Sequence, residues 1–279
     1  MSERRAPLAA FKHLLLTALS LAMIYPVIWL FLGSFKANNE IFAITNLWPS
    51  QILWHNYADG WTAVPGYSFA DFFMNSLTVS FLAVAGSIIS CTVVAFPFAR
   101  MHFPLKGLWF SLLLGTLMLP AQVLLIPRYV MFSDLGWVNS FLPLIVPSFL
   151  ATNAFFVYLM IQFMRGIPRE LDEAAIVDGC GPFRTLLLIL VPNCKPVIYT
   201  VAIFSFLWSW DDYFEQLLYL NEVRKFTVPL ALQMFVDNAA QIRWGALFAM
   251  SILSIVPPML VFFFAQKHFV EGVATSGIK

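Results

Sequence analysis

The sequence predicts an all-α integral membrane protein with six transmembrane helices. Of its 279 residues, 60% are hydrophobic and only 11% are charged, whereas soluble domains carry about a quarter charged residues. The mean hydropathy is +0.80. A helix needs about 20 apolar residues to cross the hydrocarbon layer of a bilayer, and charge-free stretches of that scale recur along the chain. Composition and stretch length therefore both favour a membrane protein.

Six apolar stretches are the predicted spans. The five long ones are Leu14–Phe35, Phe72–Ala99, Gly107–Pro127, Leu135–Met164 and Trp244–Gln266. The sixth, Pro196–Trp210, is short and continues into Leu217–Leu220 across an acidic group, which consists of Asp211, Asp212 and Glu215. The first stretch is too long for the apolar part of a secretory leader, and no small-x-small cleavage site follows it. We therefore expect it to remain as the first span.

Lysine and arginine residues predict the orientation, because cytoplasmic connections carry more of them. Six spans place both termini on one side. The connections of that side contain eleven basic residues: Arg4, Arg5, Lys12, Arg100, Lys106, Arg165, Arg169, Arg184, Lys195, Lys267 and Lys279. The other side contains five: Lys36, Arg128, Arg224, Lys225 and Arg243. Both termini are therefore predicted to be cytoplasmic.

The domain organisation follows from these spans. Residues 1–12 form a cytoplasmic N-terminus, residues 13–35 the first transmembrane helix and residues 36–71 an outer loop. Residues 72–270 form the core domain with helices two to six, and residues 271–279 form a cytoplasmic tail. The core domain contains a cytoplasmic loop at 165–195 and an outer loop at 221–243. Loops of this length without low complexity usually have a function.

Neither the cysteines nor the charge indicates a redox or nucleic-acid function. Cys91, Cys180 and Cys194 show no CxxC spacing, and two of them fall in the cytoplasmic loop, where disulfides do not persist. We expect all three to be packing residues. The formal net charge is +1, no basic cluster suits a nucleic acid, and no such partner is expected.

The cytoplasmic loop 165–195 is predicted to form two short helices. Pro168 suits the first turn of the first helix, and the acidic residues that follow suit the positive end of its dipole. Gly179 stands where a left-handed C-terminal cap is needed, and Gly181-Pro182 prevents continuation. The second helix, Phe183–Leu190, is expected to end before Pro192.

One face of the first helix contains four residues at helical spacing: Leu171, Ala174, Ala175 and Asp178. Its paired alanines would let a partner approach the backbone closely. The alternative is an amphipathic helix that lies on the membrane surface.

A family resemblance bears on this choice. Glu173-Ala174-Ala175, then Asp178-Gly179, with Pro192 and Pro196 downstream, resembles the EAA loop of the permease subunits of bacterial binding-protein-dependent ABC importers. The resemblance implies a type I ABC importer permease fold in which this loop is the coupling helix that docks on an ATPase. The residues that it assigns to coupling are Leu171, Glu173, Ala174, Ala175, Asp178, Gly179 and Pro192.

The resemblance covers nearly the whole chain and is closest to the carbohydrate-uptake branch, which includes the second maltose permease subunit. It is carried by Pro26–Lys36, Asn56-Tyr57, Asn75-Ser76, Phe98–Phe103, Met118-Leu119-Pro120, Ile126–Tyr129 and Phe269–Gly272. The chain departs from the family at Cys180 and Asn193, where alanine and leucine are usual. It also departs at Trp208–Phe214, where a Trp-Asn-Asp/Glu-Phe pattern is usual, and this weakens a substrate assignment by analogy.

The resemblance implies a set of partners. These are a homologous second permease subunit, an ATP-binding cassette ATPase dimer, an extracytoplasmic substrate-binding protein and the lipid bilayer of a bacterial inner membrane. The chain contains no GxxxxGK[ST] loop to hold a phosphate. We therefore expect no cofactor in this chain, with ATP and Mg bound by the partner ATPase.

Two other classes of protein are less consistent with the sequence. A secondary transporter or channel would place ion-coupling carboxylates near the bilayer midplane. The candidates, Asp211 and Asp212, lie roughly 22 Å along the sixth stretch, in its outer third. A membrane enzyme would need a catalytic constellation, but the histidines lie far apart along the chain, at His13, His55, His102 and His268.

The substrate path is predicted from aromatic, amide and acidic residues near the presumed centre. They are Asn75, Asn153, Trp208, Trp210, Asp211, Asp212 and Tyr213. Aromatic rings that stack on a sugar face, with amides that bind its hydroxyls, would suit a sugar or oligosaccharide. The alternative is that these side chains belong to the aromatic belt at the membrane interface.

Overall fold

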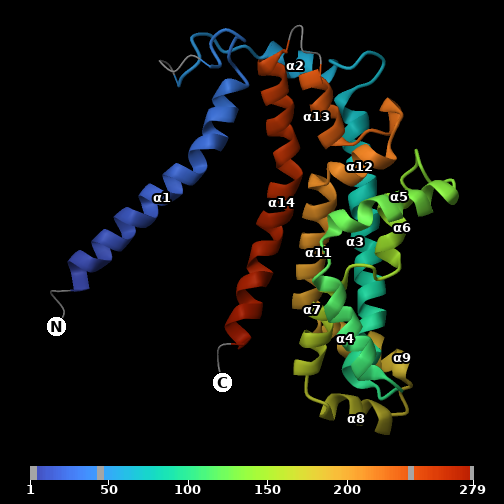
Figure 1. The fold of residues 1–279 in the computed structure, drawn as a ribbon. Coiled ribbons are helices and arrows are strands. Elements are labelled where there is room, and N and C mark those ends of the chain that lie inside the picture. The colour runs from blue at the N-terminus through green and yellow to red at the C-terminus, as the bar shows by residue number, and fades with distance from the viewer. Residues whose placement is uncertain (1–4, 43–46, 238–241, 277–279) are drawn as a thin grey trace. The chain divides into compact units, whose positions relative to one another are not determined.

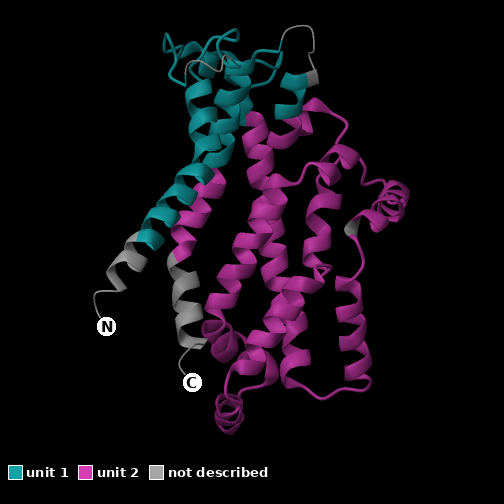
Figure 2. Cartoon of the chain, turned by 60° about the vertical axis from the view of Figure 1, so that its left-hand side comes forward, with its two compact units in different colours: residues 1–70, 232–256 teal, residues 71–231, 257–279 magenta. Residues whose placement is uncertain are grey.

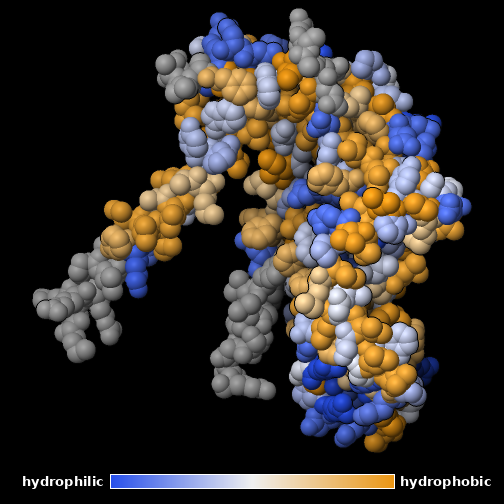
Figure 3. Space-filling model, in the orientation of Figure 1, coloured by the Kyte–Doolittle hydropathy of each residue, from blue (hydrophilic) through white to orange (hydrophobic). Residues whose placement is uncertain are grey.

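The computed structural model describes residues 5–42, 47–237 and 242–276, and within these ranges all regular structure is helical (Figure 1). In the described chain four apolar helices are long enough to cross a membrane: Phe11–Gly33, Phe69–Arg100, Leu142–Gly166 and Trp244–Gln266. Two bent helix pairs raise the number to six if each pair crosses once. In Figure 3 apolar side chains cover much of the visible surface, as expected for helices that face lipid.

The chain forms two compact units (Figure 2). Unit 1 contains residues 1–70 and 232–256, and unit 2 contains residues 71–231 and 257–279. Three helices contribute residues to both units, namely α3 (Phe69–Arg100), α13 (Val228–Asp237) and α14 (Trp244–Ser276).

Unit 1 holds α1 (Arg5–Gly33), α2 (His55–Trp61) and the first part of α14. The Asn56 side chain donates hydrogen bonds to the carbonyls of Ser34 (2.8 Å) and Lys36 (3.1 Å), which ties α2 to the end of α1. The predicted outer loop 36–71 contains the short helix α2, which was not predicted from the sequence. The predicted outer loop 221–243 likewise contains α13. Both helices are too short to resemble a span in an apolar-stretch search.

Unit 2 contains nearly all of the long helix α3 (Phe69–Arg100) and a series of shorter helices. In chain order these are α4 (Lys106–Leu117), η1 (Ala121–Leu124), α5 (Leu125–Asp134), α6 (Leu142–Phe149), α7 (Ala154–Gly166), α8 (Glu170–Val177), α9 (Pro182–Thr185), η2 (Leu186–Leu190), α10 (Val191–Asn193), α11 (Lys195–Asp211), α12 (Phe214–Tyr219) and η3 (Val223–Lys225).

Two predicted spans contain breaks in their helices. Within Gly107–Pro127 the chain bends by 96° between α4 and the helical stretch that follows it. Pro120 lies at this bend with extended backbone (φ −60°, ψ 129°), and a proline also disfavours helical backbone in the residue before it. Leu135–Met164 does not start as a helix. Its helical part begins at Leu142 and is interrupted between α6 and α7, where Asn153 caps α7 by accepting a hydrogen bond from the Phe156 amide.

The second helix of the cytoplasmic loop does not end before Pro192. The helical stretch of α9, η2 and α10 continues to Asn193, so Pro192 lies inside it. Proline has no N–H to donate and crowds the preceding turn, and the wide π-type turn of η2 accommodates it. The Asn193 side chain donates to the Ile189 carbonyl (2.7 Å) and satisfies an acceptor beside the proline.

The core of unit 2 packs α3, α7, η2 and α11 around one another. Ala95, Met160, Leu190 and Val201 are at most 1% exposed. Cys91 and Cys194 belong to this core, and all three cysteines are free thiols. Their prediction as packing residues is therefore confirmed for these two. Close helix packing is also visible at Gly86 of α3, where a Cβ atom would lie 2.6 Å from the Phe149 ring of α6.

Candidate functional site

The first candidate site is α8, which lies at the opposite end of unit 2 from α12 (Figure 1). The helix ends at Val177, and Gly179 follows with φ +76°. The Gly179 amide donates to the Ile176 carbonyl (3.0 Å) and the Cys180 amide to the Ala175 carbonyl (2.8 Å). This pair of bonds is a Schellman cap. The predicted left-handed cap at Gly179 is confirmed, whereas Pro168 lies two residues before the helix rather than in its first turn.

The inner face of α8 is fixed to the rest of unit 2. Asp172 Oδ2 lies 3.0 Å from Arg100 Nε at the end of α3, and the two side chains are 17% and 6% exposed. Ala175 is 3% exposed. The prediction that both alanines face a partner is therefore wrong for Ala175. Its side chain is buried within the subunit, because one face of this short helix packs against the rest of unit 2.

The outer face of α8 and the start of α9 are unusually apolar for an exposed surface. Ile176, Val177 and Phe183 are 68%, 87% and 67% exposed. The other predicted coupling residues on α8 and its cap are also exposed, namely Leu171, Glu173, Ala174, Asp178 and Gly179. Pro192 lies in α10 and is not part of this face. Apolar patches of this kind mark interaction sites for proteins or membranes.

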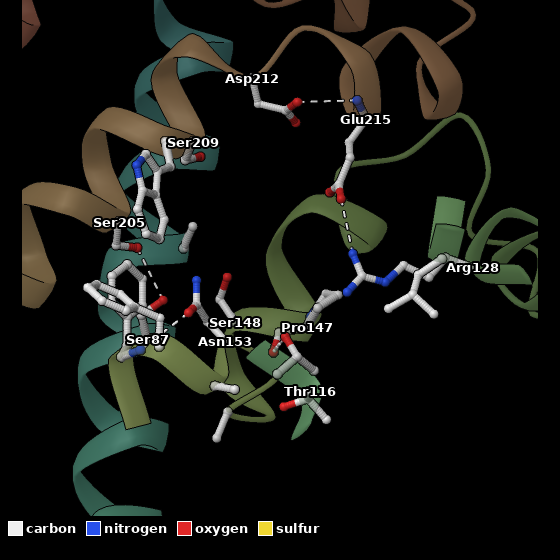
Figure 4. A pocket seen from close by; sticks show the side chains of 18 of the residues that line it. Ser87, Thr116, Arg128, Pro147, Ser148, Asn153, Ser205, Ser209, Asp212 and Glu215 are labelled. Carbon is white, nitrogen blue, oxygen red and sulfur yellow. Dashed lines mark hydrogen bonds and ion pairs between the residues drawn. The ribbon is translucent and has the colours of Figure 1, made fainter. Parts of the chain in front are cut away.

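The second candidate site is a cavity of about 1260 Å³ within unit 2. Its walls come from α3, α4, η1, α5, α6, α7, α11 and α12 and from the loops between them (Figure 4). This volume exceeds the range of about 300–1,000 Å³ that is usual for small-molecule sites.

One wall of the cavity is charged. Arg128 of α5 pairs with Glu215 of α12 at 3.1 Å, and Asp212 accepts a hydrogen bond from the Glu215 amide at 3.2 Å (Figure 4). Asp211 also lines the cavity. Among the lining residues that the structure describes, three carboxylates thus face one guanidinium.

The opposite wall presents hydroxyl and amide groups beside an aromatic ring. The Ser205 hydroxyl donates to Ser87 at 3.1 Å, and Asn153 lies nearby (Figure 4). Trp208 is 48% exposed and stacks on Phe156 with the ring centroids 5.0 Å apart. Such a mixture of flat ring, hydroxyls and carboxylates can hold a polar solute by stacking and hydrogen bonding.

The structure brings together four of the seven predicted path residues. Asn153, Trp208, Asp211 and Asp212 line the cavity, and Asn75, Trp210 and Tyr213 do not. The Asn75 side chain instead donates to the carbonyls of Arg224 (2.9 Å) and Phe226 (2.8 Å). Trp210 is 2% exposed and stacks on Phe206. Tyr213 packs edge-on against Phe214.

Several functional candidates were not predicted. Arg128 was counted only as a basic residue of an outer connection, and Ser87 and Ser205 are too common in apolar helices to stand out. Arg128 and Glu215 are opposite charges in otherwise apolar segments, where charged groups rarely occur without a partner. Their presence is the sequence feature that could have indicated this ion pair. No group of three or more His, Cys, Asp or Glu side chains within the described ranges could hold a metal ion.

Comparison with known proteins decides the family. The sequence model of the binding-protein-dependent transport system inner membrane component matches residues 91–275, which include α8 and most of the cavity wall. The chain belongs to this family. It is a permease subunit of an ABC importer, and the predicted family and function class are confirmed.

Individual relatives agree with this assignment along nearly the full length of the chain. The permease is 32% identical to the sn-glycerol-3-phosphate transport system permease protein UgpE of Brucella melitensis, over 98% of each chain. It is 27% identical to the diacetylchitobiose uptake system permease protein NgcG of Streptomyces coelicolor, over 98% of this chain and 89% of that protein.

A solved structure confirms the predicted fold of the permease. It belongs to a bacterial ABC transporter that imports the acidic polysaccharide alginate. The two chains are 21% identical and superpose with a TM-score of 0.84 over 96% of this chain and 99% of the other. The relatives are transport permeases rather than enzymes or secondary transporters.

Proposed function

We propose that this permease imports a neutral, polyhydroxylated solute, such as a sugar or oligosaccharide. In this proposal the cavity of unit 2 is the permease's half of the translocation path, and α8 is the coupling helix. The cavity is called the solute cavity from here on. The observation that carries the proposal is the joint presence in unit 2 of a capped helix with exposed apolar side chains and a large cavity whose lining includes charged, hydroxyl and amide groups.

The outer face of α8 supports docking on an ATPase. Val177 and Phe183 are exposed well beyond what an isolated subunit would favour, and they surround a helix end that Gly179 makes free of side chains. The position of a Cβ atom on Gly179 meets no atom of this chain within 4 Å, so the space there is open to a partner. A helix lying flat on lipid would also expose apolar residues, but acidic Glu173 and Asp178 on the same short helix oppose contact with an anionic membrane surface.

The lining of the solute cavity supports a neutral solute. Among the described lining residues Arg128 is the only cation, and it already pairs with Glu215, so a phosphate or uronate group would find no free positive partner in the cavity. Trp208 provides a face for a sugar ring, and Ser205 and Asn153 provide hydrogen-bonding groups for its hydroxyls. The relatives named for glycerol phosphate and diacetylchitobiose are both permeases for hydroxyl-rich solutes, and the charge of this cavity favours the neutral one.

The importer needs further components. A homologous second permease would complete the path, an ATPase dimer would bind ATP and Mg, and an extracytoplasmic binding protein would deliver the solute. In the proposed orientation both termini are cytoplasmic, which follows from the basic residues of the connections. In Lys195→Cys the new thiol should react with a membrane-impermeant thiol reagent only from the cytoplasm. In Arg224→Cys it should react only from outside. Reaction of both from the same side would contradict this orientation.

The test of the proposed solute uses the complete importer in proteoliposomes with its binding protein. Uptake of labelled maltose, diacetylchitobiose and sn-glycerol 3-phosphate is measured. ATP is supplied on the side of the membrane where α8 and the ATPase lie. We expect uptake of a neutral sugar and none of the phosphate ester. Uptake of sn-glycerol 3-phosphate alone would contradict a neutral solute, and ATP-independent uptake would contradict the importer mechanism.

A further inference from the structure

The ion pair between Arg100 and Asp172 joins α8 to the long helix α3. Arg100 is the last residue of α3, and its Nη2 also donates to the Ile167 carbonyl at 2.8 Å, between α7 and α8. Its Nε lies 3.0 Å from the Asp172 carboxylate. One guanidinium therefore holds the end of α3, the entry into α8 and the first turn of α8 together.

The pair is buried more deeply than surface ion pairs are. The Arg100 side chain is 6% exposed and the Asp172 side chain 17%. Solvent screens such a pair little, and removal of one partner leaves the other charge without compensation. Buried pairs contribute little net stability compared with apolar packing, but they hold two elements in one geometry. The arrangement therefore constrains the position of α8 relative to α3.

The helix α3 connects this pair directly to the solute cavity. Ser87, Ala83 and Val79 of α3 line the cavity, 13 to 21 residues before Arg100. At 1.5 Å per residue this is roughly 20–30 Å along the same helix. A displacement applied at Arg100 therefore reaches the cavity wall through a single helix. The helix α7, which precedes α8 and lines the cavity with its first residues, is the other direct connection.

We propose that the Arg100–Asp172 ion pair transmits the movement of α8 to α3 during the transport cycle. We treat Arg100 and Asp172 as positioning residues, because neither lines the solute cavity and both side chains are largely buried within unit 2. The proposal rests on the coupling role of α8. It predicts that breaking the pair separates ATP hydrolysis from transport: α8 still docks, but its displacement no longer moves α3.

The first test is Asp172→Asn in the complete importer, with Glu170→Gln as the matched control. Both variants remove one carboxylate from the first turn of α8, and Glu170 is exposed. Asp172→Asn should keep the ATPase bound and hydrolysis within about twofold of the wild type, while uptake falls at least about tenfold, a loss of roughly 1.4 kcal/mol in coupling. Glu170→Gln should leave both rates unchanged.

Other outcomes overturn the proposal in distinguishable ways. Uptake of Asp172→Asn within twofold of the wild type would show that the pair is not the link. Loss of the ATPase from an otherwise stable complex would assign Asp172 to docking. Failure of the subunit to accumulate would make the pair a folding contact. If instead Gly179→Asp also keeps the ATPase and full transport, the coupling role of α8 itself has failed.

A covalent bridge provides a second measurement that does not depend on Asp172→Asn. Arg100→Cys and Asp172→Cys are combined in a Cys180→Ser, Cys194→Ala background, because Cys180 is accessible and Cys194 lies near Arg100. The unbridged double variant should hydrolyse ATP without uptake, and a short bifunctional methanethiosulfonate should restore uptake to at least half of the wild-type rate. Bridging that leaves uptake unchanged, or that abolishes hydrolysis, would contradict a link that moves as one body.

Discussion

The helix α8 and the solute cavity differ in how the chain constructs them. The form of α8 is set by eight consecutive residues and by a cap whose hydrogen bonds reach five residues at most. The cavity takes its walls from elements between α3 and α12, and its central ion pair joins residues 87 positions apart. Local chemistry thus specifies where a partner docks, whereas tertiary packing specifies what the path can hold.

Trp208 and Trp210 illustrate the difference between a cavity-lining residue and a packing residue. Their replacement gives the largest expected difference in the stability of the subunit. Trp210 is 2% exposed in the packing between α11 and α3, while Trp208 is 48% exposed at the cavity. Trp210→Ala should lower the stability of the subunit by about 3–5 kcal/mol. Trp208→Ala should destabilise it far less but reduce solute uptake. Thermal unfolding in detergent and uptake in proteoliposomes separate the two effects.

Equal destabilisation by Trp208→Ala and Trp210→Ala would show that Trp208 is a core residue. The cavity would then lose the aromatic platform that the proposed sugar needs.

The two alanines of α8 sharpen the comparison on the docking side. Ala175→Leu introduces bulk at a site that is 3% exposed and should lower stability by about 1–3 kcal/mol. Ala174→Leu lies on the exposed face and should leave stability unchanged while it weakens ATPase binding. The measurements are the thermal midpoint of the purified subunit and copurification of the ATPase. An Ala174→Leu complex that retains the ATPase in full would contradict close approach at this face.

A smaller effect is expected from the carboxylates of the solute cavity. Asp211→Asn combined with Asp212→Asn removes charge but keeps most of the hydrogen-bonding capacity, so the loss should not exceed that of about one hydrogen bond, about 0.5–1.5 kcal/mol. Uptake should fall a few-fold with ATP hydrolysis retained, because ATP supplies the energy. Complete loss of uptake together with a dependence on sodium or protons would instead indicate ion coupling.

Features that depend on a few consecutive residues could be predicted from the sequence, whereas features that depend on tertiary packing could not. Gly179 was predicted as a left-handed cap because the requirement is local to the helix end, and its φ of +76° confirms it. The burial of Ala175 was not predictable, since an amphipathic face does not reveal whether it packs on its own chain or on another. The break near Pro120 was missed because an apolar-stretch search weighs hydropathy and ignores the missing N–H.

The solute cavity was predicted only in part for a related reason. Asp211 and Asp212 stand out in an apolar helix, so their functional importance was visible in the sequence. Arg128 was assigned to an outer connection, and nothing local indicates that the bend after α4 brings it to Glu215. Pairing across such a distance depends on the tertiary fold, which hydropathy and residue spacing do not encode.

The proposed coupling of this permease to its ATPase through α8 is tested most directly by Gly179→Asp. Gly136→Asp is the matched control, because both glycines have positive φ (+76° and +68°) and open space around the Cβ position. The backbone cost is therefore similar, about 1 kcal/mol, and only Gly179 lies beside the proposed docking face. We predict that Gly179→Asp loses the ATPase and transport while Gly136→Asp retains both. Normal assembly and transport by Gly179→Asp would show that α8 is a passive surface helix.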